Sequence, residues 1–174
     1  MNSAKQLQKQ REKCACDRLL NSLKLNAQFE RHGNDIDEPE CIYKFDDELL
    51  GIEVSTAYPD DRYAKRLREH ISGERKFTDE GEWLFPNPIY PDKLMKERIQ
   101  NRINDKCRKN YAGVDKIWLC IEEENPFSNE TAVKNLMKAI KVPEKYCFHY
   151  IYLLYLTPTM EGRDYKSFKI YPKE

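Results

Sequence analysis

The sequence carries no net charge, because its 30 acidic side chains balance its 30 basic ones. A strongly basic composition would indicate a nucleic-acid-binding protein on electrostatic grounds, and this sequence gives no such indication. Any surface that binds nucleic acid must therefore be a local basic patch, and acidic side chains elsewhere in the chain must balance its positive charge. An acidic catalytic cleft within such a patch would also leave the chain neutral, so neutrality does not exclude a nuclease.

Long apolar runs are also absent. The longest, Tyr150–Leu156, is far shorter than the roughly 20 residues that a transmembrane helix needs. The N-terminal segment MNSAKQLQKQREKC has no apolar stretch typical of a signal peptide. We therefore expect no membrane segment and a cytoplasmic location. A chain of 174 residues with 40% apolar side chains is typical of one folded domain.

The sequence has no CxxC pair, and its three histidines are scattered. Structural zinc sites use four Cys or His ligands, usually in closely spaced pairs. In a cytoplasmic protein, free thiols are the usual state of cysteine. The pattern therefore favours small core residues over a zinc site for most of the cysteines. They are Cys14, Cys16, Cys41, Cys107, Cys120 and Cys147.

The order of elements predicts a single mixed α/β domain over residues 1–174. Helices are expected where Gly and Pro are absent and helix-forming residues are frequent. Strands are expected in short apolar runs rich in aromatic and β-branched residues. A polar, proline-interrupted segment at about 56–91 is interpreted as an insertion, and loops of this length usually carry function. The predicted helices are Ala4 to about Phe29, Asp92–Asn110 and Asn129–Ile140, and the predicted strands are Cys41–Phe45, Leu50–Ser55, Ile117–Ile121, Phe148–Leu156 and Phe168–Tyr171.

One acid interrupts the apolar strand GIEVS. Because strand side chains alternate between faces, Ile52 and Val54 share one face, and Glu53 and Ser55 share the other. A carboxylate with apolar neighbours is costly to bury unless it is paired or binds a metal ion. Glu40 can lie across from Glu53 in an antiparallel hairpin. Two converging carboxylates, with the backbone carbonyl of Val54 as a third oxygen, would form a site for Mg²⁺ or Mn²⁺.

This hairpin resembles that of the PD-(D/E)xK nuclease superfamily, in which one acid follows a proline and a second acid stands two positions before a lysine. The matching residues are Pro39–Glu40 and, after twelve intervening residues, Glu53–Val54–Ser55. With the helix IQNRINDKCRKNY and the strand IWLCI, the chain from about Gln10 to Leu156 is similar to uncharacterised restriction-endonuclease-like proteins. The resemblance implies a restriction-endonuclease-like core, a central mixed β-sheet flanked by helices in the order α-β-β-β-α-β.

The sequence departs from the superfamily pattern at two positions. Glu40 stands where Asp is usual, and the longer acid can still bind a metal ion. Ser55 stands where lysine is expected, and serine cannot supply a cation to the scissile phosphate. Some members of the superfamily carry that lysine on the following helix. Lys106 lies within about 60° of Ile99 and Ile103 on a helical projection, so we predict that Lys106 replaces the missing lysine.

The resemblance implies metal-dependent hydrolysis of phosphodiester bonds in nucleic acid, with a DNA endonuclease as the expected activity. Glu40 and Glu53, with the carbonyl of Val54, would hold one or two Mg²⁺ or Mn²⁺ ions. A water molecule whose pKa the metal lowers would attack the phosphorus. Lys106 would stabilise the developing negative charge or help to deprotonate that water.

Three other groups of residues each have a functional and an ordinary interpretation. The superfamily carries an acid on its first helix, and Glu12 matches it geometrically as a further metal ligand, although an ordinary surface acid is the commoner case. Lys65, Arg66 and Arg68 form either a nucleic-acid-binding arm or a solvated helix face. The strand Tyr150–Tyr155 is either a core strand or a stacking platform for bases.

Three classes of protein remain open. Besides the nuclease, the chain could be a catalytically inactive nuclease-fold protein that acts as a protein- or nucleic-acid-binding module, because Ser55 replaces the lysine. It could also be an unrelated α/β protein with solvated acids on an edge strand. Convergence of Glu40, Glu53 and Lys106 within about 4–6 Å, the range of strong charge coupling, favours the enzyme. Monomer and homodimer are both compatible with the resemblance, since many such nucleases pair to cut two strands.

Overall fold

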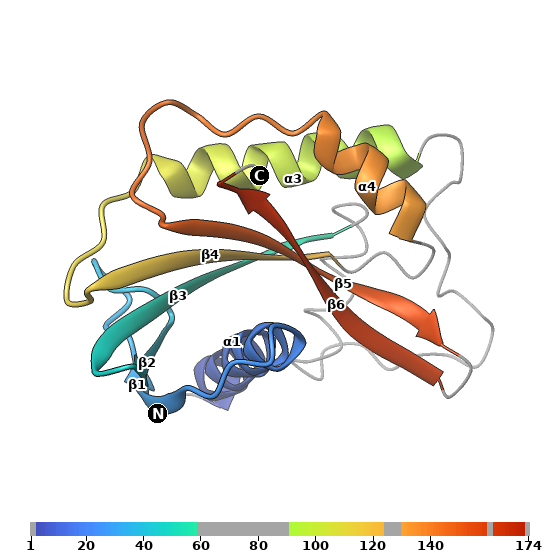
Figure 1. The fold of residues 1–174 in the computed structure, drawn as a ribbon. Helices are drawn as coiled ribbons and strands as arrows, with labels where there is room; N and C mark the ends of the chain where they lie inside the picture. Colours follow the sequence, from blue (N-terminus) through green and yellow to red (C-terminus); the bar gives the residue numbers. More distant parts are fainter. Residues whose placement is uncertain (1–2, 59–90, 124–129, 160–161, 173–174) are drawn as a thin grey trace.

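The computed structural model describes residues 3–58, 91–123, 130–159 and 162–172, which form one six-stranded sheet and three helices (Figure 1). The strands follow each other across the sheet in chain order, β1 to β6. Strands β3, β4 and β5 run parallel, and the other neighbouring pairs are antiparallel. The predicted α/β class and mixed sheet are therefore confirmed. The elements are α1 (Ser3–Ser22), β1 (Gln28–His32), β2 (Cys41–Phe45), β3 (Glu48–Ala57), α3 (Pro91–Cys107), β4 (Lys116–Glu123), α4 (Glu130–Lys138), β5 (Tyr150–Thr159) and β6 (Gly162–Tyr171).

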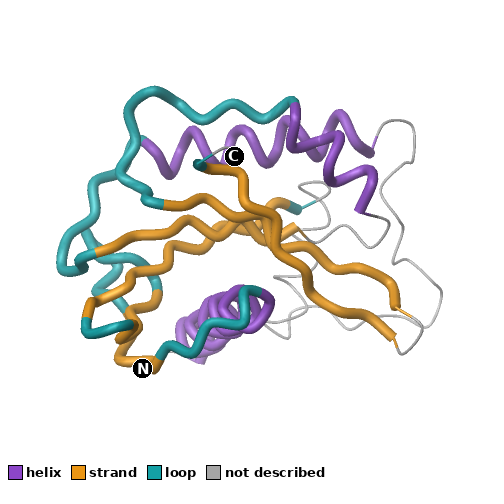
Figure 2. The backbone as a smooth tube through the Cα atoms, in the orientation of Figure 1, coloured by secondary structure: helices purple, strands orange, loops and turns teal. Residues whose placement is uncertain are grey.

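Helices cover both faces of the sheet (Figures 1 and 2). Helix α1 packs on one face, and α3 and α4 pack on the other, so two hydrophobic clusters form with the sheet between them. Because side chains alternate along a strand, neighbouring residues of β3 enter different clusters. Ile52 and Val54 lie on the α1 side, and Ala57 lies on the α3 side. The odd-numbered Glu53 therefore faces α3.

The predicted hairpin of β2 and β3 closes through a two-residue turn. Asp46 and Asp47 both have positive φ angles, 49° and 65°, as a type I′ turn requires. The ladder runs from Phe45 opposite Glu48 to Cys41 opposite Ile52. Beyond that point the described part of β3 pairs with β4 alone. Among the described residues, no strand pairs with the other edge of the last residues of β3, and this edge is called the open edge below.

The helix predicted from Ala4 to about Phe29 is too long, because α1 ends at Ser22 and the strand β1 follows. Lys24 adopts a left-handed φ of 56°, and the N–H of Leu25 donates to the carbonyl of Leu20 at 2.9 Å. This is the cap that commonly ends a helix. The sequence composition did not indicate this helix end, because Lys24 occupies the left-handed position where glycine is usual. The other predicted elements exist, with ends displaced by a few residues.

Most of the cysteines and the tyrosine-rich strand belong to the core. All six cysteines are free and four of them are buried. Strand β5 lies between β4 and β6, and its residues Tyr152 and Tyr155 are buried. The interpretation of this segment as a core strand is therefore confirmed.

The predicted insertion at about 56–91 falls mainly on residues 59–90, outside the described residues. Its first residues continue β3 as far as Ala57. Lys65, Arg66 and Arg68, predicted to bind nucleic acid, also lie outside the described residues. Within the described ranges, no helix is both long and apolar enough to cross a membrane.

Candidate functional site

Three charged side chains meet where the β2–β3 ladder ends. The Nζ atom of Lys106 lies 3.4 Å from Oε1 of Glu40 and donates a hydrogen bond to Oε1 of Glu53. The second carboxylate oxygen of Glu40 accepts a hydrogen bond from the N–H of Val54 at 2.9 Å. The structure thus brings together Glu40, Glu53 and Lys106, which the sequence predicted to converge.

Local periodicity explains why the ammonium and the acid face each other. Glu53 points from β3 toward α3, and its side chain is only 3% exposed. On α3, the buried residues Ile99, Ile103 and Cys107 form the stripe that contacts the sheet. Lys106 stands at the border of this stripe in the last turn of the helix, and its side chain is 16% exposed. The ion pair is therefore largely shielded from water.

Pro39 determines how Glu40 approaches the site. A Cβ atom on Gly51 would lie 2.4 Å from Cγ of Pro39, and one on Gly33 would lie 2.0 Å from its carbonyl oxygen. Both distances are too short for any side chain, so these two glycines permit the close approach of the proline. The N–H of Gly33 also donates to the carbonyl of Glu40 at 3.1 Å. The backbone of Glu40 is thus fixed from two sides.

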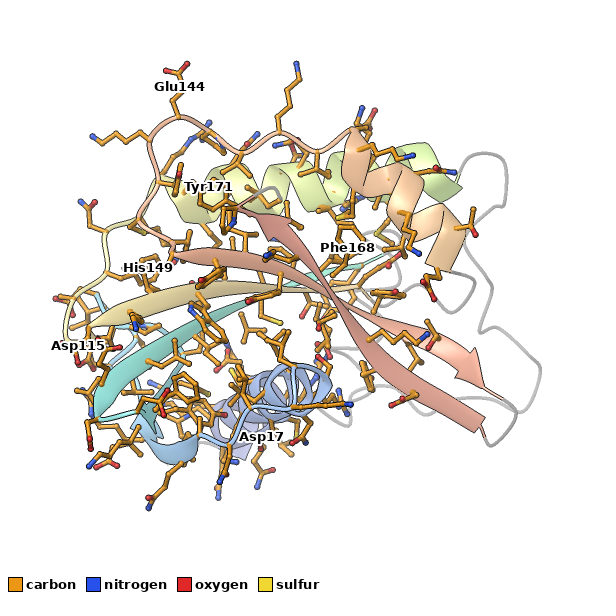
Figure 3. All side chains as sticks on the ribbon, viewed as in Figure 1. Asp17, Asp115, Glu144, His149, Phe168 and Tyr171 are labelled. Atoms are coloured by element: carbon orange, nitrogen blue, oxygen red, sulfur yellow. The ribbon has the colours of Figure 1, made fainter. Side chains whose placement is uncertain are left out.

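Backbone contacts connect the segments that carry the three side chains. Beyond the end of α3, the N–H of Ala112 donates to the carbonyl of Asp37, in the loop before β2, at 2.7 Å. Asp115, labelled in Figure 3, accepts a hydrogen bond through Oδ2 from the N–H of Leu49 at 2.8 Å. Its own N–H donates to the carbonyl of Leu49 at 2.9 Å. The start of β3 and the loop after α3 are therefore fixed relative to each other.

The three charges shift each other's pKa values. Burial, followed by the hydrogen bond and charge of Glu53, raises the pKa of Glu40 to about 8. Burial also disfavours ionisation of Glu53, but the hydrogen bond to Glu40 and the charge of Lys106 outweigh it and lower its pKa. Burial opposes the Lys106 ammonium as well, yet the two carboxylates hold its pKa above the usual value. Within this group, Glu40 is therefore the acid that binds a proton most readily, and Glu53 and Lys106 hold each other in their charged forms.

Two cavities open on this group, with volumes of about 620 Å³ and about 760 Å³. The first lies among α1, the end of β3 and α3, and the second lies beside the loop before β2 and the segment after α3. Glu40 and Glu12 line both cavities. Glu40 therefore faces both cavities, and Glu53 lines the second one.

Glu12 lies next to the carboxylate pair. Burial raises the pKa of Glu12, and the nearby charges of Asp35 and Glu53 add to this effect. Its carboxylate accepts a hydrogen bond from the side chain of Gln8 at 2.8 Å. Glu12, which the sequence predicted as a ligand on the first helix, thus lies on the wall of both cavities, at the edge of the three-residue group.

Sequence analysis did not single out two groups beside the site. The hydroxyl of Tyr111 is fully buried and lies next to the carboxylate of Glu53, toward which it can donate a hydrogen bond. Burial, followed by the charge of Glu53, raises the pKa of Tyr111, which places the hydroxyl near that carboxylate. Glu122 is also buried, lines the first cavity and pairs with Arg18 at 3.1 Å. A tyrosine that follows a helix and an acid at the end of a strand are both common in sequences. Neither one indicates a functional site by itself.

A divalent cation would depend on few ligands here. Within the described ranges, no set of three or more His, Cys, Asp and Glu side chains is arranged to hold a metal ion. The N–H of Val54 faces Glu40, and because both polar groups of a strand residue point to the same side, its carbonyl lies at the same open edge. Two carboxylates and this carbonyl supply hard oxygen atoms. Water molecules would have to complete the coordination of a divalent cation here, and the cation would have to share the two carboxylates with Lys106.

Comparison with known proteins finds no matching family model, no matching curated protein and no matching solved structure. Any function assigned to the chain therefore rests on its own residues and their geometry.

Proposed function

We propose that this protein is a Mg²⁺- or Mn²⁺-dependent nuclease of the PD-(D/E)xK type, with DNA as the expected substrate. The observation that carries the proposal is the contact of Lys106 with both Glu40 and Glu53. A lysine from the helix after the hairpin then supplies the cation that Ser55 cannot provide. Two acids and a lysine beside an accessible cavity are the groups that metal-assisted phosphodiester hydrolysis requires.

The order and direction of the elements support a restriction-endonuclease-like core. The described chain begins with α1, continues with the antiparallel strands β1, β2 and β3, and then adds α3 and β4. This is the order α-β-β-β-α-β that the resemblance implies. Strand β4 runs parallel to β3 and places its own carboxyl end beside the carboxyl end of β3. On this proposal, α4, β5 and β6 extend the core at the far edge of the sheet.

Each residue has a distinct role in the proposed reaction. Glu40 and Glu53, with the carbonyl of Val54, would hold the cation, and Glu40 would lose its proton on binding. When bound, such an ion lowers the pKa of the attacking water and withdraws negative charge from the phosphate. Lys106 would donate a hydrogen bond to a phosphate oxygen and stabilise the charge that develops there. Glu12 would bind a water molecule at the edge of the site.

The second candidate is a catalytically inactive nuclease-fold protein that binds protein or nucleic acid. The ion pair between Lys106 and Glu53 favours this alternative, because it neutralises the buried carboxylate without a metal ion. Ser55 favours it too, since its buried side chain offers no positive charge. The two candidates differ in whether a divalent cation binds the pair of carboxylates and permits turnover.

The proposal is tested with supercoiled plasmid, single-stranded DNA and RNA, each incubated with the purified protein in Mg²⁺, Mn²⁺ or EDTA. We expect cleavage of at least one substrate in the divalent ions and none in EDTA. Cleavage that persists in EDTA would exclude the metal-dependent mechanism. Binding of a substrate without cleavage in either ion would favour the inactive module.

A further inference from the structure

The cavity of about 620 Å³ has an arginine on each of two walls. Arg102 comes from α3 and Arg11 comes from α1, and both line the cavity together with Lys106. The helices lie on opposite faces of the sheet (Figure 1). Two guanidinium groups therefore approach the open edge of β3 from different directions.

Arg102 belongs to the same helix face as Lys106. They stand four positions apart, so their side chains lie on one side of α3, about 6 Å apart along the helix axis. Arg102 is half-buried. It makes no hydrogen bond or ion pair with any residue in the described part of the chain. A half-buried guanidinium that has no partner among the described residues is a candidate for binding an anion.

Arg11 is oriented on the opposite wall by contacts of its own. One of its Nη atoms donates a hydrogen bond to the hydroxyl of Tyr58 at 3.3 Å. Its charge also acts on Glu122, whose carboxylate pairs with Arg18. The acid on this wall therefore already has an arginine partner.

The edge of β3 contributes backbone groups to the same cavity. Val54 and Thr56 line it, and the N–H of Val54 faces Glu40 rather than β4. Because backbone direction alternates along a strand, the N–H of Thr56 points to the same open edge. Backbone N–H groups and arginines are frequent donors to the phosphates of nucleic acids.

We infer that Arg11 and Arg102 form a subsite for a backbone phosphate of a nucleic-acid strand, adjacent to the phosphate that Lys106 contacts. The inference rests on the proposed function, since it takes the phosphodiester at Lys106 as given. The spacing of one helical turn between Arg102 and Lys106 is close to that between neighbouring phosphates of one strand. The cavity is large enough for a nucleotide-sized part of the strand.

The test measures binding of a short, labelled single strand by fluorescence anisotropy, in EDTA so that no metal-dependent cleavage occurs. DNA and RNA of one sequence are compared over a range of salt concentrations. Arg102→Gln and Arg11→Gln should each weaken binding about tenfold at low salt. Each should also reduce the slope of log K against log salt by about 0.7. Arg108→Gln is the matched control, because the side chain of Arg108 is 80% exposed and lies away from the cavity.

The outcomes separate the subsite from the nuclease. If Arg102→Gln and Arg11→Gln are folded by circular dichroism but bind as tightly as Arg108→Gln, the subsite does not exist, even where the wild type cleaves DNA. If both variants bind more weakly and no divalent ion supports cleavage, the subsite stands and the catalytic proposal fails. If the wild type binds neither strand, the inference is overturned. Recovery of binding in Arg102→Lys would show that positive charge is the property that matters.

Discussion

The ammonium of Lys106 donates a hydrogen bond to Oε1 of Glu53, although 53 positions separate the two residues in the sequence. The same ammonium lies 3.4 Å from Glu40, so one cation serves two carboxylates from neighbouring strands. The contact joins α3 to β3 and neutralises an acid that would be costly to bury alone. Stability and proposed chemistry therefore depend on the same three side chains.

Replacing Lys106 by Met should destabilise the fold by about 2–4 kcal/mol, because it leaves Glu53 buried without its partner. Cleavage in Mg²⁺ should fall by about 10²–10³-fold, the usual cost of losing one charge-stabilising donor. Lys138→Met is the control, since Lys138 is exposed and lines neither cavity. Urea denaturation and plasmid nicking measure the two effects. Equal stability of the two variants would contradict the assigned role of the ion pair.

The raised pKa of Glu40 predicts a pH dependence of stability. A carboxyl group with a pKa of about 8 in the folded protein binds a proton more tightly than in the unfolded chain. Its contribution is fully present below the unfolded pKa and is lost as the pH rises through about 8. Without metal, stability should fall from the unfolded pKa of 4.5 up to about pH 8, by on the order of 4 kcal/mol. Glu40→Gln should remove most of this slope in urea denaturation, and an unchanged slope would contradict the shift.

The same shift predicts that metal binding releases a proton. At neutral pH Glu40 keeps its proton, and a divalent cation requires the ionised carboxylate. Calorimetric titration with Mn²⁺ in two buffers of different ionisation enthalpy should show a release close to one proton per ion at pH 7. Glu40→Gln should bind the ion more weakly and release no proton. Heats that do not depend on the buffer would show that Glu40 is ionised before the metal binds.

Glycine at position 51 is predicted to be essential because of Pro39. In Gly51→Ala the new Cβ would lie 2.4 Å from Cγ of Pro39, so the proline and the adjacent Glu40 must move. We expect a destabilisation of about 1–3 kcal/mol, the usual cost of overpacking, and reduced cleavage. Pro39→Ala removes the clashing atom, so the double variant should lose less than the sum of the two single changes. Strict additivity in thermal unfolding would mean that the two residues do not interact.

Those parts of the site that depend on local periodicity were predictable from the sequence. Because side chains alternate along β3, Glu53 was expected on the face of the sheet that Ile52 does not share. The helical repeat placed Lys106 next to the buried stripe that contains Ile99. Both inferences need only the repeat of one element. The α/β class followed in the same way from the order of the elements. The convergence of Glu40 with this pair was predictable because a short hairpin leaves little freedom in register.

Other features depend on how distant segments pack, and the sequence carries no local signal for them. The strand β1 was missed because its residues are mostly polar, and α1 stops at a lysine with a positive φ. Tyr111 acquires its position only when the segment after α3 folds against the loop before β2. Arg102 resembles any helical arginine until the open edge of β3 forms a cavity in front of it. Each of these requires tertiary structure.

The most direct test of the central claim is plasmid nicking in Mg²⁺ by the wild type and Glu53→Gln, with Glu144→Gln as an exposed control. The isosteric change removes the charge of Glu53 with little change in volume. We predict metal-dependent nicking by the wild type and by Glu144→Gln, and a loss of at least about 10²-fold in Glu53→Gln. Nicking by a folded Glu53→Gln at the wild-type rate would contradict the assignment of Glu40, Glu53 and Lys106 as a nuclease site.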